Sequence, residues 1–127
     1  MESKNQIRSY KDLEIWKRGM SLYLKIHTLS YSFPVSELYG LTAQIKRSAF
    51  SIPANIAEGW GRDSKKGFAN YLRISRGSLF ETETAIEAAF LLDFCSKDQY
   101  ILILQETQEI GKMLTSFIKN LEQSQLS

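Results

Sequence analysis

The chain has few of the residues from which catalytic and metal sites are usually built. Its 127 residues include one cysteine, one histidine and two prolines. A structural zinc site needs about four Cys or His ligands, and a nucleophile needs a base beside it. We therefore expect no metal site, no cofactor, no catalytic residue and no enzymatic activity. The lone cysteine, Cys95, lies in an apolar run and is expected to be a buried side chain in a reducing compartment.

Long apolar runs are also missing from the sequence. No stretch of about 18 apolar residues occurs, so no membrane-spanning helix is expected. Residues 1–6 lack the apolar core of a secretion signal. With 43% hydrophobic and 24% charged residues, the composition is that of a globular domain, and a chain of this length forms one domain. We expect a single soluble, cytoplasmic domain over residues 1–127.

Four segments carry apolar residues at the spacing of amphipathic α-helices, while strand-like alternation is almost absent. The expected helices cover about residues 11–31, 37–58, 64–93 and 97–121. Short connections between long helices favour antiparallel neighbours, so the prediction is an all-α, up-down-up-down four-helix bundle. The pairs Ser9 with Asp12 and Ser96 with Gln99 have the spacing of capping boxes, and Ser64 or Asp63 is expected to open the third helix.

The apolar stripes of the helices predict which side chains form the core. The first helix is expected to bury Leu13, Trp16, Met20, Tyr23 or Leu24, His27 and Tyr31; the second Leu41, Ile45, Ser48 or Ala49, Ile52 and Ile56. The third stripe runs through Phe68, Leu72, Ser75, Leu79, Thr82, Ile86 and Phe90, and the fourth through Tyr100 or Ile101, Leu104, Gln108, Gly111, Leu114, Ile118 and Leu121.

Ten further apolar residues fall outside these narrow stripes: Ile15, Leu22, Ile26, Phe50, Trp60, Ile74, Phe80, Phe94, Ile103 and Phe117. A four-helix bundle buries about three positions per heptad on each helix, so these residues exceed what one chain hides comfortably. They predict a second apolar face and hence oligomerisation. Wider core stripes are the alternative.

One proline and two glycines lie at unusual places in the expected helices. Pro53 is predicted to kink the second helix rather than split it, because Ile52 and Ile56 stay in phase across it. Gly59 is expected to end that helix in the left-handed conformation. Gly77 costs about 1 kcal/mol relative to alanine in the middle of the third helix, which suggests that packing requires it there.

Charge is distributed unevenly along the chain, although the net charge is only +2. Residues 1–43 carry six basic and four acidic side chains, residues 44–76 seven and two, and residues 77–127 three and eight. The middle segment can therefore bind a polyanion, or it can attract the acidic last segment within or between subunits. Its basic residues are the candidates for nucleic-acid contact: Lys46, Arg47, Arg62, Lys65, Lys66, Arg73 and Arg76.

Neither paired carboxylates nor glycines in the sequence make a case for catalysis. Glu83 and Glu87 are four residues apart on one helical face but lack the Glu-x-x-His partners of di-iron bundles. An acidic face turned to solvent or to another subunit explains them better. Gly59-x-Gly61 near Lys65 lacks the spacing of a phosphate-binding loop and is better explained as a helix end and turn.

Several motifs resemble one protein family closely. They are residues 16–17 (WK), 33–34 (FP), 37–41 (ELYGL), 44–47 (QIKR), 51–59 (SIPANIAEG) and 77–81 (GSLFE). Over about residues 10–121 the chain resembles bacterial four-helix bundle proteins encoded in intervening sequences of large-subunit ribosomal RNA genes. Accessory proteins of diversity-generating retroelements are more distant members of that family.

The resemblance implies a ring-like homopentamer with a central pore and a basic surface. In the retroelement members that surface serves binding to nucleic acid and to a reverse transcriptase. Matched by motif, the basic cluster here includes Lys46, Arg47, Arg62, Lys65 and Lys66. The leading hypothesis is a non-enzymatic oligomer that binds RNA or DNA backbone. The alternatives are a scaffold or accessory subunit that docks a partner enzyme such as a reverse transcriptase, and a purely self-assembling protein.

Overall fold

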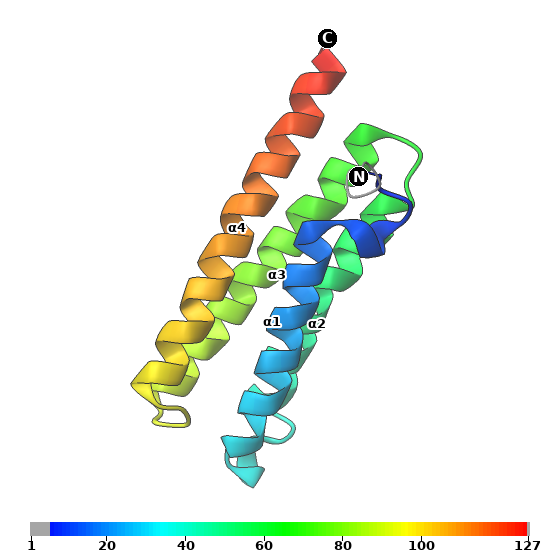
Figure 1. The fold of residues 1–127 in the computed structure, drawn as a ribbon. Helices are drawn as coiled ribbons and strands as arrows, with labels where there is room; N and C mark the ends of the chain where they lie inside the picture. Colours follow the sequence, from blue (N-terminus) through cyan, green and yellow to red (C-terminus); the bar gives the residue numbers. More distant parts are fainter. Residues whose placement is uncertain (1–5, 127) are drawn as a thin grey trace.

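The computed structural model describes residues 6–126, with side chains described up to residue 124, and within this range it is helical without strands. The four long helices are α1 (Glu14–Leu29), α2 (Leu41–Trp60), α3 (Lys65–Leu91) and α4 (Lys97–Leu126), with short 3-10 turns η2 (Tyr10–Asp12), η3 (Ser30–Ser32) and η4 (Val35–Glu37). They lie side by side along one long axis (Figure 1). The expected class, an all-α four-helix bundle, is confirmed.

Neighbouring helices are held in a definite register by paired side chains. The most extensive contact joins α2 to α3, and the contact between α1 and α4 is much smaller. Between α2 and α3, the hydroxyls of Ser48 and Thr82 are 2.9 Å apart, and those of Ser51 and Ser78 are 2.8 Å apart. Because the residue number rises on one helix as it falls on the other, these two helices run in opposite directions. Small hydroxyl side chains here let the two backbones approach closely while their polar groups stay paired.

Two capping boxes and one N-cap that the sequence predicts are present. The Ser9 and Asp12 side chains cap η2 reciprocally. At the start of α4, Gln99 N–H donates to Ser96 Oγ at 3.1 Å, and Ser96 N–H donates to Gln99 Oε1 at 2.9 Å. Ser64 caps α3 by accepting from the backbone N–H of Gly67 at 3.0 Å. Local sequence therefore determines where these elements begin.

The second helix begins later than the expected residue 37. Residues 35–37 form the turn η4 instead, and Glu37 Oε1 accepts from the backbone N–H of Leu41 at 3.0 Å, which satisfies one free donor at the start of α2. From there α2 continues through Pro53 without a break, so the helix is not split. The kink itself stays a prediction. The other helices differ from expectation mainly at their ends: α1 is shorter at 14–29, α3 covers 65–91, and α4 extends to residue 126.

The predicted core face of α1 is only partly correct, since Leu13 is buried and Trp16 and Tyr23 pack against the core, but the fully buried positions are others. Its buried residues are Ile15, Gly19, Leu22, Ile26 and Leu29, whereas the predicted Leu24 and Tyr31 are 58% and 76% exposed. The cause is that α1 carries two apolar stripes side by side, and periodicity alone does not choose between them. Gly19 distinguishes the two stripes. A Cβ at this position would lie 3.3 Å from Ile52 of α2, so the face of α1 that carries Gly19 packs against α2.

The predicted stripe of α4 is also partly wrong. Leu114 and Ile118 are buried as expected, but the first half of the helix buries Ile103, Thr107 and Ile110, and Gln108 is exposed. The predicted stripes of α2 and α3 are confirmed, with Ile45, Ile52, Ile56, Leu72, Leu79 and Ile86 fully buried.

Most of the ten extra apolar residues belong to a wider core. Ile15, Leu22, Ile26 and Ile103 are buried, while Trp60, Phe94 and Phe117 pack against the core. Within this chain, then, the wider stripes account for seven of the ten. Phe50, Ile74 and Phe80 remain about half exposed.

The expected roles of Gly59 and Gly77 are both wrong. Gly59 lies inside α2 and is buried, and no glycine among residues 6–126 has a positive φ. A Cβ at Gly59 would come within 2.7 Å of Tyr71 Cβ and 2.9 Å of Phe68 Cδ1, so this glycine permits close packing of α3 on α2. Gly77 has the opposite surroundings, because no atom lies within 4 Å of the position its Cβ would take.

The turn between α3 and α4 depends on one residue in the left-handed conformation. Asp93 has φ 62°, which Asp tolerates better than most non-glycine residues. Cys95 follows it and is partly buried, and this burial raises the pKa of the thiol. None of the helices between residues 6 and 126 combines the length and apolarity needed to cross a membrane.

Candidate nucleic-acid interface

The seven candidate cations do not form one continuous patch. Lys46 and Arg47 lie on α2 close to Ser48, which contacts Thr82 of α3. At 1.5 Å per residue, this level is roughly 25 Å along the bundle from Lys66 at the start of α3. Arg47 also donates to Gln44 Oε1 on its own helix at 2.7 Å. Lys46 and Arg47 are therefore far from Lys65 and Lys66, whereas Arg76 lies only about 9 Å from the level of Thr82 along the axis.

Arg62 serves mainly to hold the turn between α2 and α3. Its guanidinium donates to Glu58 Oε2 at 2.8 Å and to the hydroxyl of Tyr71, and it lies over the Tyr71 ring at 4.5 Å. Tyr71 belongs to α3 and Glu58 to α2, so one side chain connects both helices. The neighbouring carboxylate offsets much of the positive charge of Arg62.

Arg73 and Arg76 are turned toward α4. Arg73 forms an ion pair with Glu122, and Arg76 Nη1 donates to Thr115 Oγ1 at 3.1 Å. The pairing of Arg73 agrees with the alternative in which basic residues of the middle segment meet acidic residues of the last. Arg76, in contrast, has a neutral partner and keeps its charge available. Lys65 and Lys66 are exposed in the first turn of the same helix.

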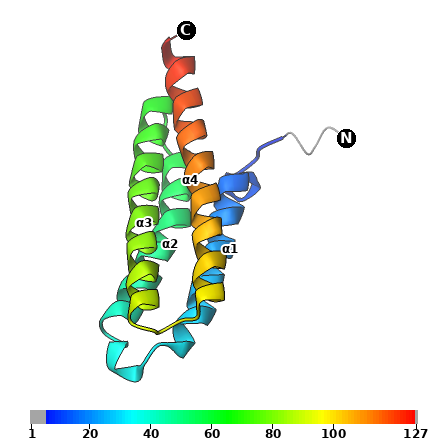
Figure 2. The same ribbon diagram turned by 90° about the vertical axis from the view of Figure 1, so that its left-hand side faces the viewer.

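Two lysines of α4, Lys112 and Lys119, join this face although the sequence did not single them out. Both line a groove of about 750 Å³ between α3 and α4. Figure 2 views the molecule from the side on which α3 and α4 lie. We call this groove the α3–α4 groove, and its other lining residues are Leu79, Phe80, Glu83, Thr107, Gln108, Gly111, Thr115 and Ser116. Among the described side chains, neither lysine forms an ion pair.

A signal for these two lysines was present in the sequence. Lys112 and Lys119 are seven residues apart, which places them two turns apart on one face of a helix. They were missed because they belong to the segment with a net charge of −5. Only packing shows that they line one groove with Phe80 and with Thr115, the hydrogen-bond partner of Arg76.

The other half of the α3–α4 contact is acidic. Glu83 Oε2 accepts from Thr107 Oγ1 at 2.7 Å, and Glu87 accepts from the hydroxyl of Tyr100. The hydrogen bond to Glu87 raises the pKa of Tyr100. Both carboxylates thus bond to α4 of their own chain and are not simply a solvent-facing pair. The contact between α3 and α4 is basic toward the start of α3 and acidic toward its end.

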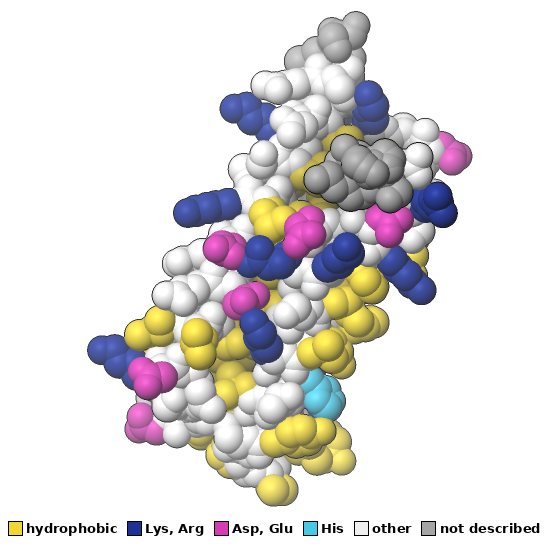
Figure 3. All heavy atoms as spheres, viewed as in Figure 1, with side chains coloured by type: hydrophobic (Ala, Val, Ile, Leu, Met, Phe, Trp, Pro, Cys, Tyr) yellow, Lys and Arg dark blue, Asp and Glu magenta, His cyan; other side chains and the backbone are white. Residues whose placement is uncertain are grey.

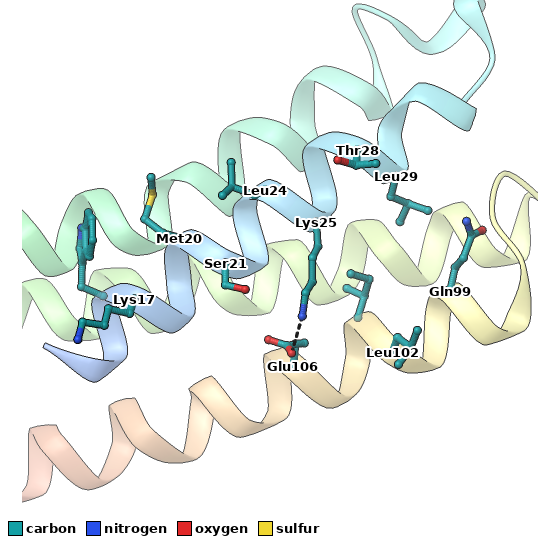
Figure 4. A pocket seen from close by; sticks show the side chains of 12 residues that line it. Lys17, Met20, Ser21, Leu24, Lys25, Thr28, Leu29, Gln99, Leu102 and Glu106 are labelled. Carbon is teal, nitrogen blue, oxygen red and sulfur yellow. Dashed lines mark hydrogen bonds and ion pairs between the residues drawn. The ribbon is translucent and has the colours of Figure 1, made fainter. Parts of the chain in front are cut away.

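A second groove lies between α1 and α4, whose mutual contact is smaller than that of α1 with α2, α2 with α3 or α3 with α4. It has a volume of about 770 Å³ and is mainly apolar, lined by Trp16, Met20, Leu24, Leu29, Leu102 and Ile103 together with polar residues. Figure 4 shows Lys25 reaching across it from α1 to Glu106 of α4, at 2.8 Å. The other carboxylate oxygen, Glu106 Oε1, is buried without a hydrogen-bond partner among the described residues.

Charged side chains of both signs alternate over α1 and α4 in Figure 3. One of the pairs joins Arg18 to Glu109, which raises the pKa of Arg18 and lowers that of Glu109. Apolar side chains gather instead at the lower end of the molecule (Figure 3), where the α1–α2 connection and the α3–α4 turn lie (Figure 1). We call this the apolar end, and its exposed residues are Tyr31, Val35, Leu38, Tyr39, Leu91 and Leu92.

The described residues define an all-α bundle protein whose distinctive surfaces are two grooves and an apolar end. No group of three or more His, Cys, Asp or Glu side chains suited to a metal ion occurs in the part of the chain that the structure describes. The chain belongs to the 23S rRNA-intervening sequence protein family, which matches residues 11–116.

A solved structure from Bacteroides thetaiotaomicron VPI-5482 is similar along most of its length. It is a protein with unknown function from the S23 ribosomal protein family. The two sequences are 31% identical, the match covers 83% of this chain and 98% of the other, and the TM-score is 0.76. No curated protein matches the chain. The family recognised from the sequence motifs is thus confirmed, whereas its link to retroelement accessory proteins stays a prediction.

Proposed function

We propose that the protein is a non-enzymatic oligomer that binds RNA or DNA through the phosphate backbone, using the basic part of the α3–α4 face. The observation that carries the proposal is that Arg76 of α3 lies next to a groove lined by Lys112 and Lys119 of α4, none of the three in an ion pair among the described residues. Lys65 and Lys66 are exposed in the first turn of α3, and Lys65 lines a separate groove that Lys112 also lines. Cations that form no direct ion pair attract phosphates over several ångströms.

The salt dependence of binding tests this proposal. Each phosphate contact contributes a slope of about 0.7–0.9 in log affinity against log salt, so three cations per chain predict a slope of roughly 2–3. The measurement is fluorescence anisotropy of labelled RNA and DNA oligonucleotides at several salt concentrations. Binding that disappears steeply with added salt supports the proposal. An absence of binding to both oligonucleotides at low salt contradicts it.

We further propose that the up-down-up-down bundle assembles as a ring-like homopentamer, as the family resemblance implies. The apolar end supports self-association, because six large apolar side chains there are between 49% and 93% exposed in one chain. Five copies would also multiply a modest basic face into a strong one.

Light scattering at micromolar concentration tests the assembly. The expected mass is about 73 kDa, which is five times the 14.6 kDa of one chain. The scattering mass should also fall when an exposed apolar residue is replaced by a charged one, as in Val35→Glu, because a buried unpaired charge is costly. A mass near that of one chain for the unaltered protein would refute the oligomer.

A second candidate function is favoured by the α1–α4 groove. Its volume, its mostly apolar lining and the unpartnered Glu106 Oε1 suit a protein-interaction scaffold or accessory subunit that docks a partner enzyme such as a reverse transcriptase. In that case the positive charge would only steer association. The anisotropy experiment separates the two, since the scaffold needs no nucleic-acid contact.

A further inference from the structure

We propose that the α3–α4 groove binds a single-stranded nucleic acid, with an unpaired base stacked on the ring of Phe80 and the flanking phosphates held by Lys112 and Lys119. This inference rests on the proposed function and adds to it the kind of strand and the residue that contacts a base. The reasons are the exposure of one aromatic ring, the arrangement of donors around it and the inability of a duplex to present an unpaired base to it.

Phe80 is an aromatic residue that lines the α3–α4 groove and is 55% exposed. Across the groove stands Gly111, which has no side chain to cover the ring. A Cβ at Gly111 would make a tight contact of 3.2 Å with Leu79 Cδ2, where α3 and α4 pack together. The close packing of the helices thus leaves an aromatic ring uncovered in a groove of about 750 Å³, within the range of roughly 300–1,000 Å³ found for ligand sites.

The groups around Phe80 suit phosphates. Lys112 and Lys119 are two helical turns apart, a rise of roughly 10 Å along α4. Thr115 lies between them and accepts from Arg76 Nη1 at 3.1 Å, which leaves the Thr115 O–H free to donate to a ligand. Ser116 adds another hydroxyl to the lining. Two ammonium groups and two hydroxyls therefore flank the ring.

The acidic side of the groove limits where the strand can lie. Glu83 also lines it, with Oε2 held by the Thr107 hydroxyl at 2.7 Å, and Glu87 continues the negative charge along α3. A phosphate backbone is repelled from that side and attracted to the side of Arg76 and Lys119. Phe80 lies between the two halves, where a base can project from a backbone held by the lysines.

A duplex does not fit this arrangement. Its bases are paired and stacked inside the helix, and exposing one costs a few kcal/mol. A single strand presents its bases freely, and stacking on an aromatic side chain is worth about 1–3 kcal/mol per base whatever the sequence. The geometry therefore favours an unpaired strand and little sequence preference.

The test compares three kinds of probe by fluorescence anisotropy: single strands that carry bases (oligothymidine and oligouridine), the same backbones without bases, and a duplex. Phe80→Leu keeps an apolar side chain and removes the ring. We expect it to weaken binding to the strands that carry bases by roughly 5- to 100-fold and to leave the abasic strand and the duplex unchanged. The oligothymidine and oligouridine arms show whether DNA, RNA or both are bound.

Two variants serve as controls. Phe50→Leu removes the ring of a phenylalanine that is similarly exposed, at 51%, but lies on α2 against Tyr23; it should leave all three affinities unchanged. Phe80→Tyr keeps a ring and should keep the affinity for bases.

If Phe80→Leu binds oligothymidine and oligouridine as well as the unaltered protein does, base stacking is wrong while phosphate binding stands. If no probe binds the unaltered protein, the proposed function fails as well.

Discussion

Replacing Lys112 and Lys119 together by glutamate is expected to lower the affinity for any nucleic acid by roughly 100-fold or more at low salt. An exposed cation about 4 Å from a phosphate gains about 1 kcal/mol in water, and reversing its charge turns attraction into repulsion of similar size. Two reversals then cost about 4 kcal/mol before screening, and tenfold in affinity corresponds to about 1.4 kcal/mol. Anisotropy at low and at physiological salt measures the loss, which should shrink as salt is added.

A matched control separates the groove from the total charge. Replacing Lys11 and Lys97 by glutamate changes the net charge from +2 to −2 just as the first pair does, since each replacement subtracts 2. Both lysines are exposed, one in η2 and one in the first turn of α4, away from the lining of the α3–α4 groove. The control pair should lose much less affinity. Equal losses for the two pairs would show that the groove is not the binding site.

Alanine substitutions at two glycines are expected to change stability in opposite directions. Gly59→Ala should destabilise the fold by about 1–3 kcal/mol, because its Cβ would meet Tyr71 and Phe68 of α3 at 2.7–2.9 Å, and overpacking of a tight contact has costs of this size. Gly77→Ala should stabilise it by about 0.5–1 kcal/mol, because the new methyl meets no atom within 4 Å and alanine loses less backbone entropy in a helix.

Thermal or urea unfolding of both variants at the same protein concentration measures these effects. The two melting temperatures should lie on either side of that of the unaltered protein, separated by several degrees. Both changes are glycine to alanine within a helix, but Gly59 lies in the last turn of α2 and Gly77 in the middle of α3, so the difference combines packing with a smaller effect of helix propensity. Destabilisation at Gly77 would contradict the open space beside it, and unchanged stability at Gly59 would show that α3 can move away from α2.

Sequence periodicity predicted the core well wherever a helix had a single apolar stripe. In α2 and α3, Ile45, Ile52, Leu72 and Leu79 repeat with little competition, and all four are fully buried. In α1, apolar residues stand next to each other, and the pattern fits two faces equally. The choice depends on Gly19, whose fit against Ile52 is a property of two helices together and cannot be read from one.

The candidate nucleic-acid interface was predicted from the sequence only in part. The cations of α3 were identified from local charge, and the structure turns Arg73 and Arg76 toward α4. Their neighbours Lys112 and Lys119 were not identified, because a count along the chain averages them with eight acidic residues in the last segment. Lys46 and Arg47 were grouped with Lys65 and Lys66 because they are near in sequence, although helix length places them roughly 25 Å apart along the bundle. Proximity between helices depends on register, which a linear count does not contain.

The hydroxyl pairs between α2 and α3 have a consequence for how the bundle opens. Ser48 with Thr82, Ser51 with Ser78, and Ser75 with the carbonyl of Ile52 would all be lost if one helix slid along the other. Between α1 and α4, the ion pairs are Arg18–Glu109 and Lys25–Glu106, both partly exposed. Exposed ion pairs contribute little and weaken with salt. Separation of α1 from α4 would break these weak ion pairs and leave the hydroxyl pairs between α2 and α3 intact, so we expect α1 and α4 to part before α2 and α3 do.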